Sequence, residues 1–183
     1  HTRLLRVSWL GDVYKRQFIF HGKQCALADY YRNIHLFFIK GKSGSELDNS
    51  VKLRQELKSL SWKEDGMWLV FLYFYGNYTH SQEQMTPHFQ AFRQQIMERF
   101  GDAPVPTTLA QAFRQRSLPL IKYANILTFN TRAIVLYIVL LLGQPWLYFV
   151  FEIVVMGLLF LFMRAKHESL CQSLTQELQQ GKY

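Results

Sequence analysis

The sequence has only two cysteines, Cys25 and Cys171, and they stand far apart with no cysteine or histidine cluster around them. It also lacks an H-E-x-x-H motif, so a disulfide framework and a dedicated zinc site are excluded. The "GKS" at residues 41–43 lacks the glycine five positions earlier that a Walker-type phosphate loop needs, because Leu36 stands there. Nucleotide binding through such a loop is therefore excluded as well.

Charge is also sparse, at 19% of 183 residues, whereas 49% of the residues are hydrophobic and 16% are aromatic. The hydrophobic residues are concentrated in a few runs, above all near the C-terminus. A chain of this length would ordinarily form one domain with a sizeable core. The formal net charge of +8 favours anionic lipid head groups over nucleic acid as a partner.

The first segment, residues 1–17, contains "VSWLGDVYKRQ", which resembles a translated adapter and transposon end from DNA-library preparation, with one G missing from a GGG run. We therefore expect residues 1–17 to be non-native, and a basic amphipathic leader is the alternative. The first methionine is Met67, and we therefore expect residues 18–183 to be the C-terminal part of a longer protein. Leaving out four of the basic residues and one acid in this segment lowers the net charge to +5.

Two long apolar runs, residues 126–142 and 146–163, are joined by "GQP" at residues 143–145. As helices they would be about 26 and 27 Å long, close to the roughly 30 Å of a bilayer core. Gly143 and Pro145 favour a tight turn between them. The sequence thus predicts a transmembrane helical hairpin; a buried hairpin of a soluble protein is the alternative.

Charge placement orients this predicted hairpin. The turn carries no charge, whereas Arg114, Arg116 and Lys122 precede the hairpin and Arg164 and Lys166 follow it. By the positive-inside rule, both ends of the hairpin are expected in the cytoplasm and the turn outside.

Upstream, the chain is expected to form amphipathic helices on or near the membrane. Apolar residues recur at helical spacing in residues 26–40 and 51–60, with a loop at 41–50 between them. The run "MWLVFLYFY" (67–75) would be only about 13 Å long as a helix, too short to span a bilayer unaided. It is interpreted as an interfacial segment, half of a broken helix, or a helix packed inside a bundle.

Capping residues predict two further helices. Thr86 and Pro87 suit the start of a helix that ends at Gly101, and Thr107 or Thr108 is expected to cap the next one.

The chain therefore divides into four segments: a non-native leader (1–17), amphipathic and interfacial helices (18–125), the transmembrane hairpin (126–163) and a cytoplasmic amphipathic tail (164–183). The expected class is all-α and integral to the membrane.

Four polar residues near or inside the hairpin are candidate site residues. Asn130 and Glu152 are intramembrane candidates, and an ionised carboxylate at the centre of a span costs roughly 2.5–3.5 kcal/mol. They either border a site for a charged head group or pair between helices to fix the packing. Lys122 and Arg132 could contact a lipid phosphate or simply anchor the interface.

Residues 117–168 resemble the C-terminal helices of a bacterial CDP-alcohol phosphatidyltransferase, closest to versions from Bacteroidetes. The segments "DYYRNIHLFFIKGKSGSELDNS" (29–50) and "FYGNYTHSQEQMTPHFQAF" (74–92) resemble the region that precedes those helices. The resemblance implies an inner-membrane helical bundle of phospholipid synthesis. Its enzymes move a phosphoalcohol group from a CDP-linked donor to an acceptor alcohol and release CMP.

The family signature, D-x-x-D-G-x-x-A-R-x8-G-x3-D-x3-D, is absent from this sequence. In the family its carboxylates hold Mg²⁺ or Mn²⁺ near the donor diphosphate. We therefore assign no catalytic or metal-binding residue, and we expect the chain to be inactive alone. The expected partners are membrane lipid and, in the parent, a CDP-linked substrate; a homodimer is left open. The alternatives are a non-enzymatic membrane-anchored interaction protein and a transporter subunit.

Overall fold

The computed structural model describes residues 2–41, 47–101 and 103–183, and every regular element in these ranges is a helix. The predicted all-α class is therefore confirmed for the described part of the chain. The predicted loop at 41–50 includes residues 42–46, which lie outside the described residues. The elements are, in order, α1 (Thr2–Lys40), α2 (Ser50–Ser59), α3 (Trp62–Met85), α4 (Pro87–Phe100), α5 (Thr107–Ile126), α6 (Phe129–Leu141), α7 (Trp146–Val150), the π-helix η2 (Phe151–Val155) and α8 (Met156–Gln179).

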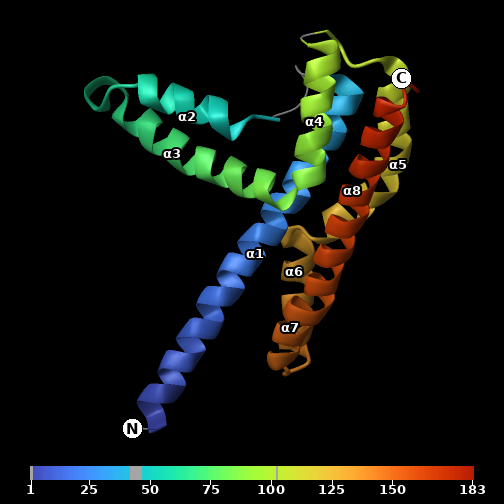
Figure 1. The fold of residues 1–183 in the computed structure, drawn as a ribbon. Helices are drawn as coiled ribbons and strands as arrows, with labels where there is room; N and C mark the ends of the chain where they lie inside the picture. Colours follow the sequence, from blue (N-terminus) through green and yellow to red (C-terminus); the bar gives the residue numbers. More distant parts are fainter. Residues whose placement is uncertain (1, 42–46, 102) are drawn as a thin grey trace.

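Four helices form the body of the molecule. The C-terminal half of α1 packs against α5, while α8 packs against both α4 and α5 (Figure 1). Aromatic rings fill the centre: Phe38 stacks on Phe113 at 4.0 Å between ring centroids and on Phe92 at 6.0 Å. Burial of such side chains, at about 1.5–3 kcal/mol each, is what holds the body together.

The predicted helix over residues 26–40 is present as the second half of the 39-residue α1. Its buried side chains recur at three- and four-residue steps, as a helix with one core-facing side requires. They are Leu27, Tyr30, Tyr31, Ile34 and Phe38. The backbone of residues 2–17 continues the same helix without a break.

The start of α4 is confirmed at Pro87, but the predicted capping role of Thr86 is wrong. Thr86 occupies the N-cap position without a side-chain cap. Its buried hydroxyl instead donates to the Gln82 carbonyl of α3 at 3.0 Å. The end of α4 is as predicted, because Gly101 adopts a φ of +56° that favours glycine.

The predicted cap of the next helix is also wrong. Pro106 occupies the N-cap position of α5, so Thr107 is already the first helical residue. The helix continues through Pro119 to Ile126.

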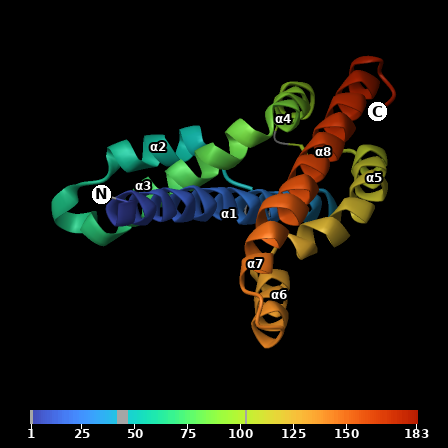
Figure 2. The same ribbon diagram turned by 90° about the horizontal axis from the view of Figure 1, so that it is seen from below.

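The two apolar runs lie antiparallel, joined at a turn where Gly143 has a φ of +66° (Figures 1 and 2). The first helix, α6, has 13 residues rather than the 17 expected, because the chain breaks at residues 127–128. The second run continues from α7 through η2 into α8. We call residues 129–163 the apolar lobe.

The predicted cytoplasmic tail is not a separate element. Residues 164–179 complete α8, and one side of them is buried in the body. Its core-facing residues are Leu170, Cys171, Leu174 and Leu178. The amphipathic spacing predicted for this segment is thus present, with α4 and α5 as the helices it packs against, and its cytoplasmic location stays a prediction.

One helix among the described residues, Trp146–Gln179, is long and apolar enough to cross a membrane. Its most apolar 18-residue window has a mean hydropathy of 2.3 and is only 28% buried. Helices α5 and α6 are long and apolar enough to cross a membrane only when taken together, across a 40° bend.

Candidate functional site

A buried polar cluster lies where the apolar lobe meets the body, and Arg132 is its centre. Arg132 sits in the first turn of α6, yet its side chain is only 1% exposed. Its Nε donates to both carboxylate oxygens of Glu152, at 2.9 and 3.2 Å. The two residues form an ion pair between α6 and the second leg of the lobe.

The same guanidinium satisfies the break between α5 and α6. Its NH1 group donates to the carbonyl oxygen of Leu127 and lies 3.4 Å from that of Thr128. Carbonyls at a helix end lack partners within the helix, so a cation placed there stabilises the interruption. The Thr128 hydroxyl donates in turn to the Asn125 carbonyl at 2.6 Å.

Glu152 reaches Arg132 from a π-helical turn. The η2 segment inserts one wider turn between α7 and α8, and Glu152, its second residue, is buried. Wider turns of this kind are rare and occur mostly as single turns inside α-helices, frequently at functional sites. Here the turn directs a carboxylate to the inner side of the lobe, away from its apolar exterior.

Helix α1 supplies the third side of the cluster. The side-chain oxygen of Gln24 accepts from NH2 of Arg132, and His21 Nδ1 lies 3.1 Å from a Glu152 oxygen. Cys25 Sγ lies 3.5 Å from Arg132 NH1. The second amide atom of Gln24, Nε2, is buried with no hydrogen-bond partner among the described residues.

The contacts of this Arg132 cluster hold α1, α6 and η2 together. All three guanidinium nitrogens of Arg132 contact acceptors of the chain, which leaves the side chain no free face for a lipid phosphate. Removing one partner of such a buried pair costs about 3–5 kcal/mol, because the other charge is left unpaired. Of the two roles considered for Glu152, interhelical pairing is the one that its contacts support.

The other two predicted residues lie outside this cluster. Asn130 is exposed on the first turn of α6. Lys122 is exposed on α5, beside a shallow apolar groove whose lining includes Leu118, Tyr123 and Ile126. A cation next to an apolar groove suits the phosphate and chains of a lipid, so lipid contact stays a prediction for Lys122.

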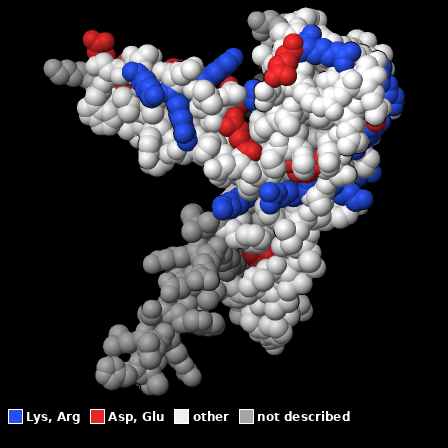
Figure 3. Space-filling model, viewed as in Figure 1, with Lys and Arg blue, Asp and Glu red and all other residues white. Residues whose placement is uncertain are grey.

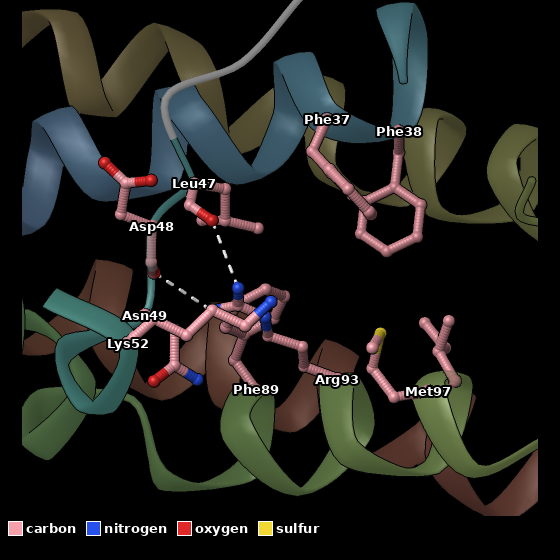
Figure 4. A pocket seen from close by; sticks show the side chains of 10 residues that line it. Phe37, Phe38, Leu47, Asp48, Asn49, Lys52, Phe89, Arg93 and Met97 are labelled. Atoms are coloured by element: carbon pink, nitrogen blue, oxygen red, sulfur yellow. Dashed lines mark hydrogen bonds between the residues drawn. The ribbon is translucent and has the colours of Figure 1, made fainter. Parts of the chain in front are cut away.

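A second hollow, of about 310 Å³, lies between α1, α2 and α4 (Figure 4). Phe37 and Phe38 of α1 line it opposite Phe89 of α4, and Lys52 of α2 lines it as well. The Arg93 guanidinium donates to the carbonyls of Leu47 and Asp48, both at 3.1 Å. That cation therefore fixes the chain segment beside the hollow.

Two buried histidines in the body bring further polar groups together. His35 Nδ1 and the Ser117 hydroxyl are 2.6 Å apart, and burial, with a smaller effect of Arg114, lowers the pKa of His35. His167 stacks on Tyr31 at 3.9 Å, and complete burial lowers the pKa of its imidazole to about 3. Both rings lie in tightly packed surroundings and act in core packing.

Sequence reasoning missed the contribution of α1 to the cluster. A signal for Gln24 exists, because it shares a helix side with Leu27, Ala28 and Tyr31, which are all buried. A polar side chain in register with a buried stripe needs a polar partner. The identity of that partner is set by the tertiary fold.

No group of three or more His, Cys, Asp or Glu side chains that could hold a metal ion occurs within the described ranges. The Mg²⁺ or Mn²⁺ expected for the parent enzyme thus has no fitting set of ligands there.

Comparison of the chain with protein-family models, with curated proteins and with solved structures found no match.

Proposed function

We propose that this chain supplies the closing, membrane-embedded helices of a bacterial inner-membrane transferase of phospholipid synthesis. The enzyme moves a phosphoalcohol group from a CDP-linked donor to an acceptor alcohol. The observation that carries the membrane part is the inverted polarity of the lobe: its large apolar side chains face outward, and its ion pair is inside. The transferase part rests on the resemblance across residues 117–168.

The outward side chains support contact with lipid. Both legs of the lobe expose them along their length. Contiguous exposed apolar surface of this kind marks contact with a membrane or a partner. The exposed set includes Ile134, Tyr137, Leu141, Ile153, Leu158 and Leu161.

Charge at the base of the lobe supports its orientation. Figure 3 shows Lys and Arg gathered where the lobe joins the body, while the surface of the lobe itself is nearly free of charge. Lys122 precedes the lobe, and Arg164 and Lys166 follow it. Both ends of the lobe are therefore proposed to be cytoplasmic, with the turn at 142–145 outside.

Within this proposal, the Arg132 cluster is a positioning device. It fixes the distance between α6, η2 and α1, so the two legs enter the bilayer as one unit. Lys122 is the residue proposed to contact a lipid phosphate. We derive no chemical step and no metal-dependent step from the residues of this chain.

The test is to recover the full reading frame, purify the encoded protein in detergent and assay it for CMP release from a CDP-linked donor. We expect release that requires Mg²⁺ or Mn²⁺. A frame without the D-x-x-D-G motif, or a product that releases no CMP, would contradict the transferase and favour the anchored interaction protein or the transporter subunit. In the active product, Lys122→Ala should raise the KM for lipid up to about fivefold; Lys182→Ala is the matched control.

A further inference from the structure

The paired helices α2 and α3 (Ser50–Met85) form an arm that projects from the body (Figures 1 and 2). They are held together by a small contact: Leu53 and Leu72 are buried, and Gly76 lies against Leu53, where an added Cβ would stand 3.8 Å from the Leu53 Cβ. Toward its C-terminal end, α3 packs against α1, where Thr79 and Gln82 are buried and Gln82 donates to the carbonyl of Ala26 at 2.8 Å. The side of residues 67–74 that faces away from α2 is exposed.

The free side of α3 is apolar and aromatic. Met67, Val70 and Phe74 recur at three- and four-residue steps opposite Leu72 and Gly76; Met67 is 89% exposed and Phe74 is 67% exposed. Phe71 and Tyr73 flank this side and are exposed as well. We call this surface the aromatic face. Trp68 lies at its border with α2, where the indole Nε1 donates to Glu56 at 3.4 Å, and Tyr78 lies beside α1, close to Asp29.

No Asp, Glu, Lys or Arg occurs in residues 66–82. A helix surface of this length without charge is poorly suited to water. Helix α2 is different, because Lys52, Arg54 and Lys58 are all exposed on it.

The position of the arm indicates which partner covers the aromatic face. Within the arm, α3 lies on the side toward the apolar lobe and α2 on the side away from it (Figure 1). The aromatic face points away from α2, because α2 occupies the opposite side of α3. A bilayer that surrounds the lobe would therefore meet the aromatic face first.

We propose that α3 lies in the membrane interface, with its aromatic face among the lipids and the α2 cations above anionic head groups. This inference rests on the proposed crossing of the bilayer by the lobe. Trp and Tyr favour the interface because an apolar ring and a polar group are both satisfied there. Helices with one apolar side and a basic neighbourhood bind anionic membrane surfaces in this way. Of the three interpretations of residues 67–75, the structure favours the interfacial one.

The test uses spin labels on the full chain, with Cys25→Ser and Cys171→Ala as background, in nanodiscs containing phosphatidylglycerol. Labels are placed at Phe74→Cys on the aromatic face, at Gln55→Cys on α2 as the matched control, and at Leu141→Cys on the lobe. Collisions with oxygen report lipid, and collisions with a soluble nickel chelate report water. We expect at least a threefold higher ratio of oxygen to nickel accessibility at position 74 than at position 55.

Three results would overturn the inference. Water access at position 74 with lipid access at position 141 would remove the interfacial arm and leave the membrane lobe intact. Water access at both positions would remove both proposals. A label at position 74 that is shielded from both reagents, and freed by dilution with unlabelled chain, would show that a second copy covers the face.

A second measurement avoids changing the cysteines. Quenching of tryptophan fluorescence by shallow doxyl lipids is compared between the unaltered chain and Phe74→Trp. The inference predicts that the added indole contributes a strongly quenched component, and an added component that these lipids leave unquenched contradicts it.

Discussion

The two halves of α8 differ in what surrounds them. The second half buries Leu170, Leu174 and Leu178 in the body. The first half turns Leu158 and Leu161 outward and belongs to a lobe whose charges, Arg132 and Glu152, are inside. One continuous helix thus buries its large apolar side chains at one end, as proteins in water do, and exposes them at the other end. Under the proposed function, this difference places the boundary between water and lipid near Arg164.

The polar pairs show the same reversal. In the body, Arg116 and Glu177 form an exposed pair at 2.7 Å, and this contact, together with Lys182, lowers the pKa of Glu177 to about 2. In the lobe, the Arg132–Glu152 pair is almost fully buried. The first is an ordinary surface pair, whereas the second holds helices together.

The largest expected effect comes from the core of the body. Phe113→Ala removes a fully buried ring that stacks on Phe38, so we expect a loss of about 3–5 kcal/mol in the free energy of unfolding. Unfolding by added SDS, followed by circular dichroism, measures it. Leu158→Ala in the lobe is the control and should change this free energy by less than about 0.5 kcal/mol in a supporting detergent. Equal losses would abolish the contrast between body and lobe.

Breaking the Arg132–Glu152 ion pair should lower the free energy of unfolding by a similar amount, here through electrostatics. Glu152→Ala leaves the Arg132 charge buried and unpaired, at a cost of about 3–5 kcal/mol. The double variant Arg132→Met with Glu152→Leu should recover only part of this loss. No charge then remains buried, but the Leu127 carbonyl and the Gln24 side-chain oxygen lose their donor. A double variant as unstable as Glu152→Ala alone would show that the pair is not the cause.

The positions of the helices could be predicted from the sequence, but the contacts of the Arg132 cluster could not. Pro87, Gly101 and the spacing of aromatic residues mark helix boundaries and core-facing sides through local chemistry. The pairing of Arg132 with Glu152 and Gln24 depends on how three distant helices meet. A charge inside an apolar run signals that some partner exists without identifying it.

The full length of α3 also could not be predicted from the residues of this segment alone. The helix runs from Trp62 to Met85, through Gly76 and Asn77, which are poor helix formers. Packing of α2 against Gly76 favours the helix there. The capping error at Thr86 has a related origin, since its hydroxyl donates to a carbonyl of the preceding helix.

A smaller effect should appear as a pH dependence in the body. His167 is neutral in the folded chain, because burial lowers its pKa from 6.5 to about 3. Its contribution to stability is fully present above pH 6.5 and is lost as the pH falls from 6.5 toward 3, by up to about 1.4 kcal/mol per pH unit.

Burial also raises the pKa of the adjacent Glu168, which opposes this slope. The measurement therefore compares unfolding of the unaltered chain with His167→Gln between pH 7 and pH 5. The substitution should make the slope of stability against pH less positive. Parallel curves would show that His167 does not titrate on unfolding.

The smallest effect is expected at the surface pair. Glu177→Gln should lower the free energy of unfolding by less than about 1 kcal/mol, and 1 M salt should remove most of the difference. A loss as large as that of Glu152→Ala would mean that exposed and buried pairs stabilise this fold alike.

The most direct measurement of the central claim is the behaviour of the purified chain when detergent is removed. With the lobe's apolar exterior left in water, we predict that the chain aggregates, and that nanodiscs or vesicles added during removal retain it as a folded species. Size-exclusion chromatography with light scattering reads both results. A compact, detergent-free monomer of 21.7 kDa would contradict the account.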